Sequence, residues 1–234
     1  MLYELRFYKV PHGRVEDNDA RHRTHLPPIF ARHSINVVGR WAGLAGPDLP
    51  SFVYIMAYQD FSEREAQWAG FYGDDEWWQI REETNAGSEM VDQYDIHFLK
   101  PNAFWQPKAL PSGERIDGVH ELIFADIGTG KIAAANEFVK SSWIPAIESG
   151  GGKIMMVADF VSGIRLPRIA LMIAWPDADS YFSGRPEVDR DPAIRAAQKS
   201  EREIFGRTSI GRVETHLLVP ARYNLPLATL GLNS

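Results

Sequence analysis

The sequence of 234 residues contains no cysteine. This absence excludes disulfide bonds, thiolate metal ligands and cysteine nucleophiles. No apolar run approaches the roughly 18 residues that a membrane-spanning helix needs. The first ten residues already carry Glu4, Arg6 and Lys9, so they do not have the pattern of a secretory signal peptide. A cytoplasmic location is therefore expected.

Basic charge and several catalytic motifs are also scarce. The chain has 25 Lys and Arg against 31 Asp and Glu, a net charge of −6, and its basic residues are spread along its length. Nucleic-acid binding needs a basic face, so no such partner is expected. There is no G-x-S-x-G sequence for a serine nucleophile, and the glycines of 149–153 lack the spacing of a phosphate-binding loop. The remaining composition is that of a globular protein.

One phrase of the sequence occurs twice. "LPSFVYIMAYQD" at 49–60 and "LPRIALMIAWPD" at 166–177 share Leu-Pro, an apolar run and a final Ala, aromatic and Asp, and they lie 117 positions apart. A repeat keeps one register, so the pattern predicts two tandem copies. Three further pairs lie 117 positions apart: Phe7 and Phe124, Pro28 and Pro145, and Asp74 and Asp191. Near the end of each copy the offset is 119, as between His97 and His216 and between Pro101 and Pro220.

Each copy has the order strand, helix, strand, strand, helix, strand, which is typical of a ferredoxin-like unit. Ser62, with Glu65 three places later, has the pattern of a helix N-cap. In copy one the strands are expected at 3–10, 35–42, 51–58 and 89–99, and the helices from Arg14 to a break at Pro27–Pro28 and from Ser62 to about Asn85 with an interruption near Gly73–Asp74.

A ferredoxin-like unit covers one face of its sheet with helices and leaves the other face bare. Two units in one chain are expected to bury these faces against each other, sheet to sheet, in an α+β fold. The expected boundaries are 1–101 for the first unit, 102–116 for a linker rich in proline, 117–220 for the second unit and 221–234 for a C-terminal tail.

Several features together resemble the NIPSNAP family. They are "YELR" opening a strand, a glycine-basic turn, a helix broken by proline, a strand ending Ala-aromatic-x-Asp, a Ser-x-Arg helix start and the helix "DDEWW". The resemblance is firm from Tyr3 to Pro101, while the second copy has "HELIF" and "RDPAIRAA" instead. It implies two tandem NIPSNAP-like domains forming an intrachain dimeric α/β barrel. That superfamily includes cofactor-free monooxygenases, muconolactone-type isomerases and haem enzymes, so the resemblance implies a fold rather than one chemistry.

The two copies differ at polar and aromatic positions. Arg6 matches Ile123, His33 matches Gly150, Trp41 matches Ala158, Tyr54 matches Leu171 and Trp77 matches Ile194. Either the copies drifted apart, or copy one carries a ligand pocket. The second interpretation makes Arg6 the group that holds an anion or carbonyl and His33 the acid or base, because the ordinary pKa of histidine is about 6.5. Trp41, Tyr54 and Trp77 would wall the pocket, and Arg81 would share the helix face of Trp77. The alternative for Arg6 is a surface pair with Glu4.

No metal site is expected, since His22, His25 and His33 lack the spacing of paired ligands on one helix. Three functions stay open. The first is an enzyme acting on a small, largely apolar or aromatic organic molecule without metal or redox cofactor, of the monooxygenase or isomerase type. The second is a non-catalytic protein that binds a small ligand or forms an oligomeric scaffold. The third is a haem-dependent enzyme, with His33 as the histidine to test. Association into a homodimer is an open alternative.

Overall fold

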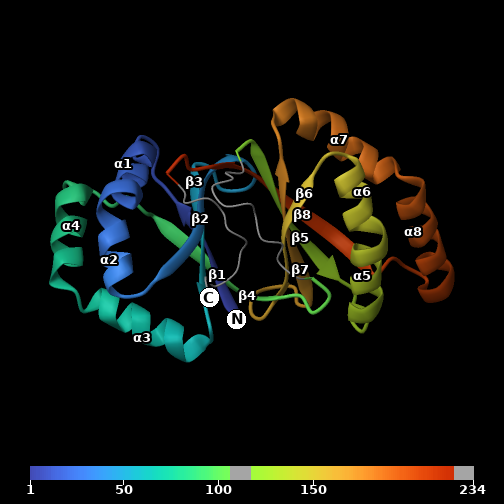
Figure 1. Ribbon diagram of the computed structural model, residues 1–234, viewed down its shortest axis with the longest axis horizontal. Coiled ribbons are helices and arrows are strands. Elements are labelled where there is room, and N and C mark those ends of the chain that lie inside the picture. The colour runs from blue at the N-terminus through green and yellow to red at the C-terminus, as the bar shows by residue number, and fades with distance from the viewer. Residues whose placement is uncertain (106–116, 224–234) are drawn as a thin grey trace.

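The two halves of the chain have the same order of strands and helices. The computed structural model describes residues 1–105 and 117–223. In Figure 1 the helices of each half lie on the outside and the strands lie between them. The elements of the first half are β1 (Leu2–Lys9), α1 (Val15–Ala20), the π-helical turn η1 (Arg21–His25), α2 (Leu26–Arg32), β2 (Asn36–Ala45), β3 (Ser51–Tyr58), α3 (Phe61–Tyr72), α4 (Asp75–Asn85) and β4 (Gln93–Pro101). Those of the second half are β5 (Val119–Ile127), α5 (Ile132–Phe138), the π-helical turn η2 (Val139–Trp143), α6 (Ile144–Ser149), β6 (Lys153–Phe160), β7 (Arg168–Trp175), α7 (Ala178–Arg190), α8 (Pro192–Phe205) and β8 (Ile210–Pro220).

The strands of the described residues close into one antiparallel barrel, in the order β1-β3-β2-β8-β5-β7-β6-β4. Each half contributes a sheet of ferredoxin-like order, and the halves also join at their edges. Trp41 of β2 lies opposite Pro220 of β8, and Leu99 of β4 lies opposite Phe160 of β6. The expected sheet-to-sheet packing is confirmed, and pairing at both edges makes it a closed barrel.

Alternation along β1 decides which side chains enter the barrel. Tyr3, Leu5 and Phe7 belong to the hydrophobic cluster of the barrel interior. The residues between them, such as Glu4 and Arg6, point to the other face because successive strand residues alternate, and there they meet the helices. Strands β3 and β7 are buried along their whole length, since one face packs on the interior and the other on helices. This explains why the repeated phrase is almost continuously apolar.

The aspartate that ends each repeated phrase caps a helix. Asp60 accepts a hydrogen bond of 2.9 Å from the backbone N–H of Glu63 at the start of α3, and Asp177 accepts one of 2.7 Å from Ser180 at the start of α7. The expected cap at Ser62 is therefore wrong by two positions. Strand β3 ends at Tyr58 and α3 begins at Phe61, which leaves Asp60 as the N-cap, a position that aspartate favours as much as serine.

The expected break at Pro27–Pro28 takes the form of a π-helical turn. Turn η1 precedes α2, whose first turn holds the two prolines, and η2 precedes α6, whose first turn holds Pro145. A proline has no N–H to donate, so the first turn of a helix is where it costs least. Both halves therefore interrupt their first helix in the same way.

The predicted linker and tail fall mostly outside the described residues, which omit 106–116 and 224–234. The strand expected at 89–99 begins later, at Gln93, and the one expected at 35–42 continues to Ala45. Among the described residues, no helix is long and apolar enough to cross a bilayer.

Candidate functional site

A cavity lies in the first half between the sheet and its helices, where the sequence predicted a pocket. It has a volume of about 50 Å³. Tyr54 and Trp77, both predicted as wall residues, line it. The other lining residues are Tyr8, Asn18, Arg21, His22, Leu26, Phe30, Trp68, Phe71 and Tyr72. Most of the wall is aromatic, and the polar groups come mainly from one helical segment.

Three polar residues of the wall share one helix face. Asn18, Arg21 and His22 have the spacing i, i+3 and i+4, which brings side chains together on an α-helix, and the segment passes from α1 into η1. All three are buried, with exposed fractions of 0%, 6% and 1%. Both amide atoms of Asn18 and Nδ1 of His22 have no hydrogen-bond partner among the described residues. Buried polar atoms are normally paired, so these atoms are available to a ligand.

His22 is a neutral imidazole at ordinary pH. Burial lowers its pKa well below the usual value, and the positive charges of Arg40, Arg21 and Arg6 lower it further. Its ring packs against Phe52 at 4.4 Å and Tyr54 at 5.1 Å between ring centroids. A neutral histidine in this setting can accept a proton from a bound molecule.

A chain of hydroxyl groups runs along the sheet side of the cavity. The hydroxyl of Tyr54 donates to the hydroxyl of Tyr8 at 2.6 Å, and Nη1 of Arg6 lies 3.5 Å from that same Tyr8 oxygen. Burial raises the pKa of Tyr54 well above its usual value, so both its proton and its hydrogen bond are retained at neutral pH. Tyr54 thus presents an uncharged hydroxyl to the cavity.

Arg6 is buried in an ion-pair network just behind this wall. It binds Glu4 at 2.6 Å, and Arg64 binds the same carboxylate at 2.9 Å. The guanidinium of Arg6 also lies 4.0 Å from the centroid of the Trp68 ring. Burial alone would raise the pKa of Glu4, but Arg64 and Arg6 hold it below its ordinary value. The alternative of an Arg6–Glu4 pair is right about the partner, but the pair is buried rather than at the surface.

The remaining predicted site residues lie away from the cavity. His33 binds Asp74 through Nε2 at 2.8 Å, at the start of α4. Trp41 points into the barrel, on the other face of the sheet, and Arg81 pairs with Glu89 at 2.7 Å on the surface. The described residues include no group of three or more His, Asp or Glu placed to hold a metal ion.

Sequence reasoning passed over Asn18 and Arg21, and it considered His22 only as a residue that differs from its match Val139 and as an improbable metal ligand. A usable signal was present in the repeat. The matching residues of the second half are Ala135, Phe138 and Val139, so a whole helix face changes from polar to apolar. Helical spacing and the copy-to-copy difference together would have identified this face.

A second cavity, of about 290 Å³, occupies the matching place in the second half. Phe138, Arg185 and Ile194 line it where Arg21, Trp68 and Trp77 line the first cavity. The matches of the first-half residues Tyr8, His22 and Tyr54 are the smaller side chains Ala125, Val139 and Leu171. Its wall carries Arg185, Asp189 and Glu201 but no histidine.

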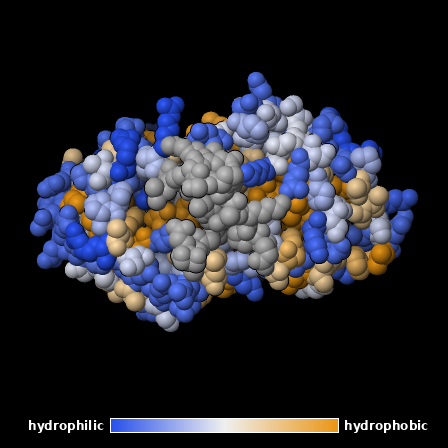
Figure 2. Space-filling view, in the orientation of Figure 1, coloured by the Kyte–Doolittle hydropathy of each residue, from blue (hydrophilic) through white to orange (hydrophobic). Residues whose placement is uncertain are grey.

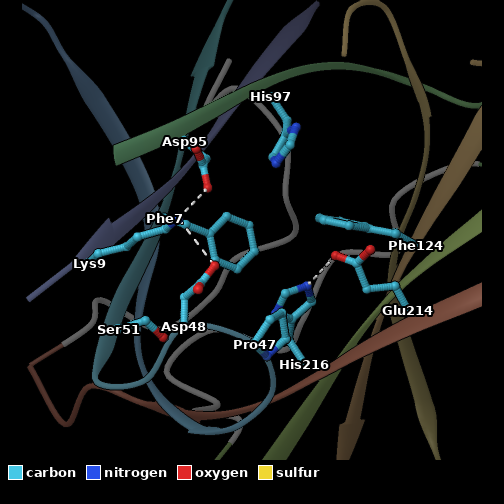
Figure 3. A pocket seen from close by; sticks show the side chains of 10 residues that line it. All are labelled: Phe7, Lys9, Pro47, Asp48, Ser51, Asp95, His97, Phe124, Glu214 and His216. Carbon is cyan, nitrogen blue, oxygen red and sulfur yellow. Dashed lines mark hydrogen bonds and ion pairs between the residues drawn. The ribbon is translucent and has the colours of Figure 1, made fainter. Parts of the chain in front are cut away.

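A third cavity, of about 70 Å³, opens at one end of the barrel (Figure 3). Here the two halves contribute the same pair of residue types, a phenylalanine and a histidine each. Phe7 and Phe124 lie between His97 and His216, with ring centroids of Phe7 and His216 4.8 Å apart. Burial lowers the pKa of both histidines, so both are neutral at ordinary pH. On the face shown in Figure 2, hydrophilic residues prevail at the left end of the molecule, over the helices of the first half.

The comparisons with known proteins agree with this architecture. Residues 3–106 match the NIPSNAP family model. An anthrone oxidase-like protein has a TM-score of 0.59 at 11% identity, with 94% of this chain and 91% of that chain covered. A candidate monooxygenase from Lactobacillus acidophilus NCFM has a TM-score of 0.57 at 13% identity, with 94% and 93% covered. At these identities the likeness concerns the fold.

A NIPSNAP domain protein from Burkholderia xenovorans is 26% identical over 45% of this chain and 99% of its own, with a TM-score of 0.39. A search among curated proteins finds no match. The first half, residues 3–106, therefore matches the NIPSNAP family model, and the second half has the same ferredoxin-like order of elements in the same barrel.

Proposed function

We propose that this protein is an enzyme that acts on a small, largely apolar or aromatic organic molecule, using the cavity of the first half and no metal or redox cofactor. One observation carries the proposal. Asn18, His22 and Trp77 each line a cavity with aromatic walls, and each has a buried polar atom without a hydrogen-bond partner among the described residues. Such unpaired atoms favour a ligand that supplies both hydrogen-bond donors and acceptors.

Proton transfer is the chemistry that these residues support. His22 is neutral and can take a proton from a carbon or hydroxyl group of the substrate, leaving a substrate anion and an imidazolium. The positive charges that lower the pKa of His22 would stabilise that anion, since they act in a water-poor site. Asn18 and the indole N–H of Trp77 would orient the substrate. Proton removal of this kind can begin either an oxygenation or an isomerisation.

The cavity must widen to admit an aromatic molecule. Its volume of about 50 Å³ lies below the roughly 300 Å³ at which pockets for organic ligands usually begin. Tyr72 lines the cavity and has an exposed fraction of 49%, so its ring is the side chain that can move aside with least loss of packing. Substrate entry is therefore proposed beside Tyr72.

Anthrone is a suitable first compound, because the same fold carries an anthrone oxidase-like protein. In the test reaction His22 would remove a proton from the methylene carbon, and the resulting anion would react with dioxygen to give anthraquinone and water. The measurements are oxygen uptake and anthraquinone formation by the purified protein. His22→Gln should lower the rate by about 100-fold or more, as for other general bases.

The matched control is His12→Gln, at an exposed position of the same half. It should leave the rate unchanged. If a panel of anthrones and phenols gives no His22-dependent turnover, the enzymatic proposal fails. The non-catalytic alternative, a protein that only binds a small ligand, would then stand.

A further inference from the structure

We propose that the molecule bound in the first-half cavity carries an anionic oxygen group, a carboxylate or phenolate, and that Arg21 binds this group. The inference rests on the proposed function of the same cavity and names its substrate class. Its basis is the surroundings of the Arg21 guanidinium, which the proposed proton transfer uses only as one of three positive charges near His22.

Arg21 is a buried cation whose hydrogen-bond partners are all neutral. Nε donates to Oγ1 of Thr84 at 2.7 Å. Nη2 donates to Oδ1 of Asn85 at 2.6 Å and to the backbone carbonyl of Arg81 at 3.3 Å. Within residues 1–105 and 117–223 no carboxylate lies within ion-pair distance of Arg21. Buried charges in proteins are normally paired, so this guanidinium lacks the counter-ion that its burial calls for.

The nearby carboxylates are already engaged. Glu89 pairs with Arg81 at 2.7 Å and also accepts from the side-chain amide of Asn85 at 3.0 Å. Glu4 is a single carboxylate shared by two guanidiniums, Arg6 and Arg64. The walls around the cavity therefore carry more positive than negative charge, and an anion entering it would be attracted.

The side chain of Arg21 borders the ligand space, and one of its guanidinium nitrogens is not engaged by the described residues. Arg21 lines the cavity, and its Nη1 makes no hydrogen bond to the part of the chain that the structure describes. Asn18 and His22 lie beside it on the same helix face. A carboxylate or phenolate oxygen could accept from Nη1 of Arg21 and from Nδ2 of Asn18, while the rest of the molecule packs against aromatic rings. A charge-assisted contact of this kind is stronger than one between neutral groups.

The size of the cavity suits a ligand that places only its anionic group inside and leaves its apolar part nearer the opening. A space of about 50 Å³ can hold a carboxylate group in place of a few water molecules. The apolar part would then extend toward Tyr72, at the open side. In the second half Phe138 stands where Arg21 would be and Ala135 where Asn18 would be, so the matching cavity lacks the anion-binding face.

Benzoate and benzamide are the probes, because they share shape and differ in charge. Titration calorimetry with the full chain should show benzoate binding at least about tenfold tighter than benzamide. Arg21→Gln should remove that preference, and Arg21→Lys should retain part of it. The matched control is Arg23→Gln, two residues along the same turn, whose side chain is exposed and pairs with Asp19 and Glu16. It should bind benzoate as the unchanged protein does. Circular dichroism establishes that each variant is folded.

Equal affinity for the acid and the amide, no binding of benzoate at millimolar concentration, or full benzoate affinity in folded Arg21→Gln would each overturn the inference. The comparison of benzoate with benzamide uses the unchanged protein, so it tests the inference even if Arg21→Gln does not fold. His22→Gln separates this result from the proposed enzymatic function. It should lose turnover and keep the preference for benzoate. Arg21-dependent binding without turnover of any compound would leave the anion site standing and refute the enzyme.

Discussion

The indole N–H of Trp41 donates a hydrogen bond of 2.8 Å to Nδ1 of His120, joining the two halves of the chain inside the barrel. Trp41 is fully buried, so replacing it with phenylalanine removes both the donor and part of the packing. Trp41→Phe should lower the free energy of unfolding by roughly 1 to 3 kcal/mol. Chemical denaturation measures this. Trp78→Phe, at a largely exposed position, should change it by less than about 0.5 kcal/mol, and equal effects would contradict the assignment.

The Glu4 carboxylate is expected to be essential for stability. Glu4→Gln leaves Arg6 buried without its charged partner, and removal of one member of a buried pair typically costs about 3 to 5 kcal/mol. Glu121 occupies the matching position in the second half, where it pairs with Arg185 at 3.0 Å. Burial raises the pKa of Glu121. The pKa of Glu4, in contrast, is held down by the two arginines Arg64 and Arg6. Glu121→Gln should therefore cost less at pH 7. A reversed order in denaturation experiments would refute this explanation.

Acid should destabilise the protein through His22. Its pKa in the folded state lies well below 6.5, whereas in the unfolded chain it is ordinary, so the unfolded chain binds a proton first as pH falls. Stability is then lost as pH decreases below about 6.5, by up to roughly 1.4 kcal/mol per pH unit for one group. His22→Gln should reduce the decline measured between pH 7 and pH 5, with part remaining because His97 and His216 shift in the same direction. An unchanged slope would show that His22 is not buried in neutral form.

The two capping aspartates should be equivalent. Asp60→Ala and Asp177→Ala each remove the side-chain acceptor at a helix N-terminus, and each should cost about 1 kcal/mol. Thermal unfolding of the two variants measures the effect. Ser62→Ala is the control, since the helix does not use it as a cap, and a larger loss there than at Asp60 would favour the capping box first expected from the sequence.

Absorbance spectroscopy tests the haem alternative. The purified protein is expected to have no Soret band. Added haemin should also produce no Soret band that disappears when His33 is replaced, because Nε2 of His33 is engaged by Asp74 at 2.8 Å. A Soret band lost in His33→Ala would favour the haem-dependent function over the proposed one.

Patterns of the sequence sufficed for the order of strands and helices in each half and for the packing of the two sheets against each other. Period-two alternation in β1, the apolar phrase of β3 and β7 and the constant offset between copies all reflect local chemistry that repeats. The pairing of β2 with β8 was not predictable, because edge pairing depends on how two distant sheets twist together. The misplaced cap at Ser62 arose because Asp60 and Ser62 both suit an N-cap. The end of the preceding strand, which selects Asp60, is not visible in the local pattern.

The place of the candidate cavity was predictable from the sequence, but most of the residues that line it were not. His33 was chosen because histidine titrates near neutrality, whereas His22 owes its role to complete burial, which one sequence does not display. Arg6 has a residue type suited to anion binding, but Glu4, two residues away, already neutralises it. Trp41 was assigned to the same wall as Tyr54, although the bulge in β2 between Val37 and Gly39 complicates counting of faces along that strand.

Covalent fusion of the two halves fixes how many binding faces one barrel has. Two identical chains assembled into such a barrel would each bring Asn18, Arg21 and His22, and the two sites could respond to each other across the shared strands. In this chain the corresponding positions of the other half are Ala135, Phe138 and Val139. One barrel therefore presents the face once, so saturation at this face should follow a simple hyperbola with a Hill coefficient of about 1.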